Sequence, residues 1–206
     1  MPRLIYNYSV MNSGKSLHLL QVAYNYRTNN RKVLIIKPDV DNRFGSDTTE
    51  IQLDDITKSI NVPVGEVTSR LGVKQASVLI SPELDIYELI KEIEAIDVLL
   101  VDEAQFFTKK QIDQISDVVD YMNIDCLCYG IKTDAYGELF EGSKRLLELS
   151  DKTNELKQIC HCGTKATMHL KYQNGEVVKQ GSQVDIGAEE KYVSVCRFHW
   201  KEAMKS

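Results

Sequence analysis

The feature that most constrains the fold is an eight-residue stretch near the N-terminus that resembles a phosphate-binding loop. It consists of Ser9, Val10, Met11, Asn12, Ser13, Gly14, Lys15 and Ser16. The apolar run 4–6 precedes it and a helix-like run, 17–26, follows it. A strand, a tight loop ending in Gly-Lys-Ser and a helix can together hold nucleotide phosphates, because the loop amides and the helix dipole favour an anion. In this pattern Lys15 reaches the terminal phosphates and the Ser16 hydroxyl binds Mg²⁺, although Ser9 stands where the pattern has its first Gly.

A second informative stretch, residues 97–107, contains four consecutive apolar residues that are followed by Asp102 and Glu103. This pattern is typical of a central parallel strand whose carboxyl end bears acids. Open parallel α/β sheets bind ligands outside the carboxyl ends of their strands, so we expect this end to meet the phosphate loop. Asp102 fits the acid that holds Mg²⁺, and Glu103 is placed to face a substrate hydroxyl. An isolated acid pair at a strand end would more simply be solvated.

The remaining patterns predict alternating strands and helices, which is the mark of an α/β fold with a parallel sheet. Thr108 is the expected N-cap of one helix, and Pro38 is expected to stop one strand. We predict helices over 14–28, 85–96, 108–122 and 143–149, and strands over 33–37, 62–67, 78–80, 98–101, 124–130 and 154–159. The stretch 38–75 is only weakly patterned.

The C-terminal part of the chain carries the residues of a metal site. Cys160 and Cys162 form one close pair, and Cys196 and His199 form another. Two such pairs joined by a loop suit tetrahedral Zn²⁺, which can replace a core too small to hold itself. Because four protein ligands close the site, we predict a structural metal, with His161 as a competing ligand. The alternative is three unrelated thiols.

Composition sets the class of protein and its partners. The 206 residues, 43% hydrophobic and 27% charged, allow a globular domain at 1–150 and a small metal-binding domain at 151–206. A net charge of −5 argues against binding long nucleic acid. No apolar run approaches the ~20 residues of a membrane span, and the N-terminus lacks a secretory signal pattern. We therefore expect a cytoplasmic protein with neither a nucleic-acid nor a membrane partner.

Taken together, the motifs resemble those of the zinc-containing, phosphate-loop thymidine kinases (type II), and most closely the bacterial branch. The order and spacing of the motifs carry the resemblance, which covers essentially the whole chain. They lie at residues 8–16, 41–44, 101–107, 128–134, 137–140, 160–163 and 191–199.

The resemblance implies a RecA-like parallel-sheet domain followed by a small zinc-ribbon and lasso domain. It also implies ATP-dependent phosphorylation of the 5′-hydroxyl of thymidine to thymidine monophosphate, with Glu103 as general base. Ser16 and Asp102 would hold Mg²⁺, and Cys160, Cys162, Cys196 and His199 would hold structural Zn²⁺. The implied ATP and phosphate contacts are residues 9–16 together with Arg43, Asp102, Glu103 and Gln105.

The same resemblance implies the nucleoside contacts. Phe106 would stack on thymine, and Met11 and Ile131 would line the pocket. A lasso loop, residues 181–192, would close over the base mainly through backbone hydrogen bonds, and its contacts would be Gln183, Val184, Asp185, Ile186, Gly187 and Tyr192. The resemblance also implies that related deoxynucleosides bind. Members of the family are typically homotetramers, and they are inhibited by their end product, thymidine triphosphate.

Two other function classes remain open on the residues alone. One is a phosphate-loop ATPase that acts on nucleic acid or on a protein partner. The acidic net charge and the lack of a basic stripe disfavour it. The other is a non-catalytic binding protein that has kept the fold, which the intact Lys15, Ser16, Asp102 and Glu103 disfavour. A kinase assay over a panel of nucleosides distinguishes all three.

Overall fold

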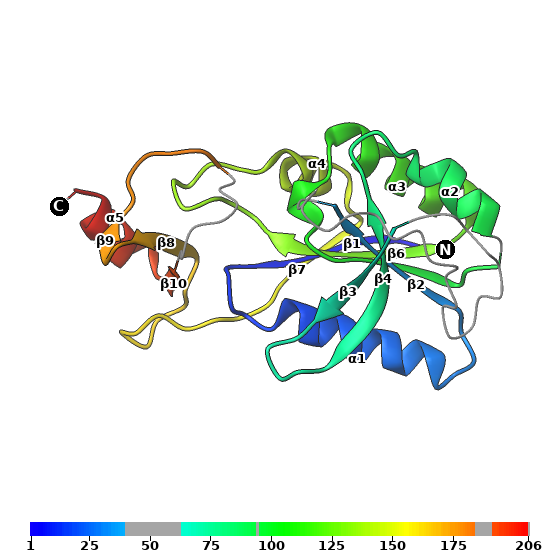
Figure 1. The fold of residues 1–206 in the computed structure, drawn as a ribbon, viewed down its shortest axis with the longest axis horizontal. Coiled ribbons are helices and arrows are strands. Elements are labelled where there is room, and N and C mark those ends of the chain that lie inside the picture. Colours follow the sequence, from blue (N-terminus) through cyan, green and yellow to red (C-terminus); the bar gives the residue numbers. More distant parts are fainter. Residues whose placement is uncertain (40–62, 94, 184–190, 206) are drawn as a thin grey trace.

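A computed structural model describes residues 1–39, 63–93, 95–183 and 191–205 (Figure 1). Within these residues the larger sheet has seven strands in the order β3-β4-β2-β5-β6-β1-β7. The strands are β1 (Leu4–Ser9), β2 (Val33–Pro38), β3 (Val64–Thr68), β4 (Lys74–Ile80), β5 (Val98–Val101), β6 (Asp125–Ile131) and β7 (Lys152–Glu155). All neighbours pair in parallel except β3 and β4, which pair antiparallel.

The centre of this sheet is apolar and covered on both faces, as parallel sheets require. All four residues of β5 are buried, and β2 is buried at Val33, Leu34, Ile35 and Ile36. Strand β6 lies between β5 and β1 and pairs in parallel with each. The carboxyl ends of β1 and β5 therefore lie at the same edge of the sheet, one strand apart.

Helices cover the two faces of the sheet (Figure 1). Helix α1 (Lys15–Arg27) lies on one face, where Leu19 and Leu20 join the same hydrophobic cluster as Ile35 and Leu100. Helices α2 (Ile86–Ile93), α3 (Lys109–Met122) and α4 (Glu141–Leu149) lie on the other face, where their apolar residues form a second cluster. Helix α3 begins as predicted, because Thr108 forms a capping box with Gln111.

The C-terminal part forms a small separate layer at one end of the molecule (Figure 1). It contains the antiparallel strands β8 (Met168–Gln173), β9 (Glu176–Val177) and β10 (Lys191–Val195), followed by helix α5 (Arg197–Lys205). Its core consists of Cys160, Ala166, Leu170 and Val195, and Val10 from the phosphate loop packs into it. The single-turn helix η1 (Ala104–Phe106) follows β5 in the larger domain.

One predicted strand is displaced. The strand expected at 154–159 is β7 at Lys152–Glu155, which pairs in parallel with β1 between Ile5 and Tyr8. The larger sheet therefore extends past residue 150. No helix in the described part of the chain is both long and apolar enough to cross a bilayer.

Candidate active site

The phosphate loop joins β1 to α1 and is built for close approach of a ligand. Gly14 has a φ of +79° and lies directly before the first residue of α1. A Cβ atom there would meet no other atom within 4 Å, so the backbone faces open space. Residues 11–17 line a cavity of about 740 Å³. The loop amides and the N-terminus of α1 are therefore accessible to an anion in that cavity.

Lys15 is folded against its own loop. Its Nζ donates to the carbonyl oxygen of Val10 at 2.8 Å, and only 8% of the residue is exposed. Burial lowers the pKa of Lys15, whereas the charges of Glu103 and Asp102 raise it. The ammonium group thus lies at the cavity wall, next to both acids that end β5.

Ser9 and Val10 contribute differently from the rest of the loop. The Ser9 hydroxyl donates to the carbonyl oxygen of Leu156, and Val10 lies in the core of the small domain. Both residues line a second, minor pocket of about 10 Å³. Their side chains therefore anchor the loop at its start.

Ser16 and Asp102 bring two hard oxygen ligands together. Ser16 Oγ donates to Asp102 Oδ2 at 3.3 Å, and Asp102 is 5% exposed. Burial and the neighbouring Glu103 charge raise the pKa of Asp102 to about 6, although the hydrogen bond from Ser16 lowers it. A hydroxyl and a carboxylate beside a phosphate site are the ligands that Mg²⁺ takes from protein, so these two residues fit that ion.

Glu103 is held by a chain of hydrogen bonds. It adopts a φ of +49° and lines the same cavity as Lys15. Gln105 Nε2 donates to Glu103 Oε2, while Gln105 Oε1 accepts from the backbone N–H of Ile131 at 3.1 Å. A Cβ atom on Gly130 would lie 2.7 Å from Gln105 Oε1, so a larger residue there would push this amide oxygen out of its position. Gln105 therefore ties Glu103 to the end of β6.

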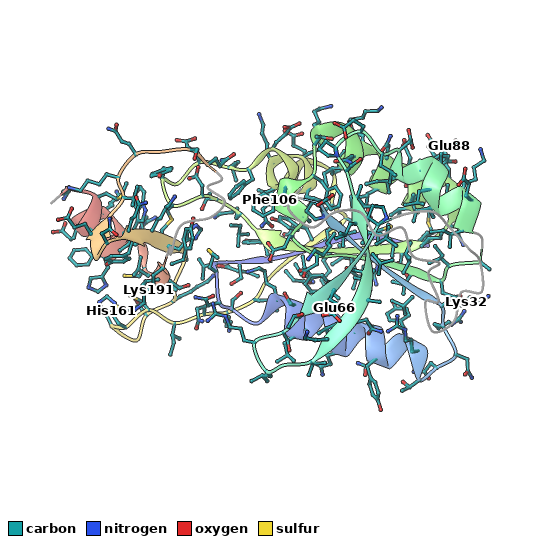
Figure 2. All side chains as sticks on the ribbon, viewed as in Figure 1. Lys32, Glu66, Glu88, Phe106, His161 and Lys191 are labelled. Atoms are coloured by element: carbon teal, nitrogen blue, oxygen red, sulfur yellow. The ribbon has the colours of Figure 1, made fainter. Side chains whose placement is uncertain are left out.

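The main cavity also contains an aromatic and apolar end. Phe106 lies at the edge of the sheet that faces the small domain (Figure 2). Its ring packs edge-on against the ring of Phe140, with the two ring centroids 5.6 Å apart. The predicted nucleoside contacts that line this cavity are Met11, Phe106, Ile131, Gln183 and Tyr192. Gln183 Nε2 donates to Asp134 Oδ2 at 3.1 Å, which fixes the start of the lasso loop. Arg43, Val184, Asp185, Ile186 and Gly187 lie outside the described residues.

The sequence reasoning missed two buried polar residues of β8 that line the cavity, His169 and Lys171. Burial and the charge of Lys15 lower the pKa of His169 to about 4, so the imidazole is neutral. Its Nδ1 has no hydrogen-bond partner among the described residues, and its ring meets Tyr192 edge-on at 5.9 Å. Two polar residues at i and i+2 between apolar ones share one strand face, and that alternation was the available signal.

The predicted metal ligands converge in the small domain. The ligand atoms of Cys160, Cys162, Cys196 and His199 lie within 4.8 Å of one another. His199 Nδ1 is 3.4 Å from Cys160 Sγ and 3.3 Å from Cys196 Sγ, and the sulfur atoms of Cys162 and Cys196 are 3.9 Å apart. The ligand separations of tetrahedral zinc are about 3.8 Å, given zinc–sulfur bonds of about 2.3 Å. The three cysteines and one histidine therefore form a metal site that fits zinc, and His161, labelled in Figure 2, packs its ring against His199.

The chain is similar to known proteins over nearly its full length. The family model for thymidine kinase matches residues 3–200. The thymidine kinase of Mannheimia succiniciproducens is 46% identical over 206 residues, which cover 98% of this chain and 96% of that protein. The thymidine kinase of Haemophilus influenzae is 45% identical over 98% of this chain and 97% of its own length. Among solved structures, the Pif1 helicase of Candida albicans aligns with a TM-score of 0.40 and 12% identity, over 77% of this chain and 36% of the helicase.

Proposed function

The chain belongs to the thymidine kinase family, and from that premise we propose that it transfers the γ-phosphoryl group of ATP directly to the 5′-hydroxyl of thymidine. The observation that carries this proposal is that Lys15 and Glu103 line one cavity together with the ring of Phe106. A phosphate site, an acid and an aromatic platform in one cavity are what in-line transfer to a nucleoside needs.

In this proposal the phosphate loop binds the triphosphate of ATP. The amides of residues 11–16 donate to phosphate oxygens, and Lys15 exchanges its bond to the Val10 carbonyl for a phosphate oxygen. Ser16 and Asp102 hold Mg²⁺, which when bound neutralises the charge that develops on the transferring group. Arg43, which lies outside the described residues, adds a further cationic contact to the phosphate.

Glu103 acts as general base on the 5′-hydroxyl. Because Gln105 Nε2 occupies Glu103 Oε2, the other carboxylate oxygen is left to accept the proton. Such a base contributes on the order of 10²–10⁴-fold to the rate. The hydrogen bond from Gln105 orients Glu103, so Gln105 assists the base in addition to its predicted contact with phosphate.

Thymine stacks on Phe106, whose orientation is supported by the edge-on contact with Phe140. Met11 and Ile131 line the base, and Tyr192 packs against the nucleoside. The lasso loop completes the pocket with backbone hydrogen bonds from Gln183 and from 184–187. Near its start, the loop is already fixed by the hydrogen bond from Gln183 to Asp134.

The metal in the small domain is zinc in a structural role. Three thiolates and one imidazole are the soft ligand set that zinc prefers, and four protein ligands leave no open position for substrate. Zinc bound there stabilises a small sheet with a core of few residues.

The decisive experiment is a kinase assay with Mg²⁺-ATP and a panel of deoxynucleosides, with Glu103→Gln as the inactive control. We expect thymidine monophosphate to form in the wild type and to fall by two to four orders of magnitude in the variant. ATP hydrolysis that is stimulated by DNA and indifferent to nucleosides would contradict the proposal. ATP and thymidine binding without product would contradict it as well.

We also propose a homotetramer that thymidine triphosphate inhibits. Light scattering after size exclusion measures the assembly directly. Competition of thymidine triphosphate against both ATP and thymidine measures the inhibition, and an inhibitor constant above millimolar would argue against feedback control.

A further inference from the structure

Three consecutive carbonyl groups of the phosphate loop each accept a hydrogen bond from a side chain. The carbonyl of Val10 accepts from Ser13 Oγ at 3.0 Å and from Lys15 Nζ. The carbonyl of Met11 accepts from Ser194 Oγ at 2.6 Å. The carbonyl of Asn12 accepts from Gln158 Nε2 at 2.8 Å. The last two donors come from outside the loop: Ser194 lies on β10, and Gln158 lies on the segment that leads into the metal site.

These two contacts fix the direction of the loop amides. A peptide unit is planar and trans, so its C=O and N–H groups point in opposite directions. A carbonyl of Met11 held by Ser194 turns the N–H of Asn12 the other way. A carbonyl of Asn12 held by Gln158 likewise turns the N–H of Ser13. Both N–H groups belong to the loop segment that lines the cavity, where an anion site needs its donors.

Further contacts bind the loop to the small domain. Val10 packs in the same core as Cys160 and Val195, and Cys160 is one of the metal ligands. Asn12 Nδ2 donates to the backbone carbonyl of Tyr192 at 3.4 Å. The small domain thus holds three successive loop residues, Val10 by packing and Met11 and Asn12 by hydrogen bonds. These hydrogen bonds join residues that are 146 to 183 positions apart in the sequence.

We infer that Ser194 and Gln158 are positioning residues for phosphoryl transfer: by holding the carbonyls of Met11 and Asn12, they keep the phosphate loop in its ATP-binding conformation. The inference rests on the proposed function, since it takes the loop to bind ATP. It makes the affinity for ATP depend on the small domain, which the proposal otherwise connects only with the nucleoside and with stability.

The test uses Ser194→Ala, Gln158→Met and the double variant of the full-length, zinc-loaded protein. Calorimetry measures the Kd of a non-hydrolysable ATP analogue with Mg²⁺, and in a separate titration the Kd of thymidine. Each lost hydrogen bond should weaken ATP-analogue binding about 2- to 10-fold, as expected for neutral bonds that preorganise a site. The Kd of thymidine should differ from the wild-type value by less than about 2-fold in the same variants.

Three controls separate positioning from general damage. Ser194→Thr restores the hydroxyl and suits a strand, so it should recover most of the ATP-analogue affinity. Gln173→Met makes the matched change at the last residue of β8, where Gln173 pairs with Glu176, and should leave both affinities as in the wild type. Zinc content and the thermal midpoint verify that each variant is folded.

ATP-analogue affinity that stays at the wild-type value in the double variant would overturn the inference. So would a parallel loss of both affinities together with zinc, because that pattern indicates a purely structural role. A wild-type protein that fails to bind the ATP analogue would instead refute the proposed function, so the two failures are distinguishable.

Discussion

Ser16 and Asp102 lie 86 residues apart in the sequence, yet Ser16 Oγ donates to Asp102 Oδ2 at 3.3 Å. The parallel sheet produces this contact, because β1 and β5 both end at the same edge and only β6 separates them. The contact joins the start of α1 to the acids after β5, so the phosphate loop and Glu103 face one cavity.

Glu103→Gln should lower kcat by on the order of 10²–10⁴-fold while the Kd of thymidine stays close to its wild-type value. The amide has nearly the same shape, but it does not accept the proton of the 5′-hydroxyl. Steady-state kinetics and calorimetry measure the two quantities. An unchanged kcat would remove Glu103 from the role of general base.

Lys15→Met should reduce kcat/KM more than Glu103→Gln does, because it removes a positive charge from the transferring phosphate in a water-poor site. Lys15 is buried, so methionine should fill much of its volume and the protein should remain folded. Thermal unfolding checks the fold, and an ATP-analogue titration measures the binding. A folded variant with near wild-type turnover would contradict the assignment.

Gln105→Leu should lower kcat about 10-fold while the KM of thymidine changes little. The substitution removes the donor that orients Glu103 and leaves the N–H of Ile131 without its acceptor. A buried N–H without a partner costs about 1–3 kcal/mol, so the free energy of unfolding should fall by that amount. A loss of stability with no change in kcat would make Gln105 purely structural.

Removal of the metal by a chelator should lower the thermal midpoint and raise the KM of thymidine. The Cys3His site connects the segment before β8 with the end of β10, the strand that carries Tyr192. Without the metal this small sheet retains a core of only a few residues. Readdition of Zn²⁺ should restore both values, and a chelated protein with unchanged midpoint and kinetics would refute the structural role.

His169 should make the stability of the fold depend on pH. Its pKa is about 4 in the folded protein and about 6.5 when unfolded, so the unfolded state binds more protons between these values. Its contribution to the free energy of unfolding is complete above about pH 6.5 and is lost as the pH falls toward 4, a change on the order of 3 kcal/mol. Denaturant unfolding at several pH values from 4 to 7 measures the free energy of unfolding. This free energy should depend less steeply on pH in His169→Gln than in the wild type, and an equal dependence on pH would contradict the prediction.

Prediction from sequence worked best where local chemistry and tertiary structure agree. The capping box at Thr108 and the apolar run of β5 are local signals, and both elements form as expected. Strand β7 was misplaced because its sequence, Lys152–Glu155, is polar and half exposed, and only its pairing with β1 makes it a strand. An edge strand of this kind has no hydrophobic pattern to read.

The residues of the candidate site also fall into those that local motifs predict and those that depend on the tertiary fold. Lys15, Ser16, Asp102 and Glu103 belong to motifs whose spacing carries their chemistry, and the structure places them together. The bond between Gln105 and Glu103 depends on the single turn of η1 and on the space above Gly130, which no spacing rule contains. His169 lines the cavity because the tertiary fold brings β8 to it, which no local pattern in the sequence predicts.

The positive φ of Glu103 determines which substitutions at this position would stabilise the protein. Asn accounts for four of the six non-glycine residues with positive φ in the described part of the chain, and Glu tolerates that conformation much less well. Replacing Glu103 by glycine should relieve roughly 1 kcal/mol of strain and also remove a carboxylate beside the buried Asp102. Selection of this protein for heat resistance alone would therefore tend to erase the group on which turnover depends, so any screen for hardier variants must score product formation as well.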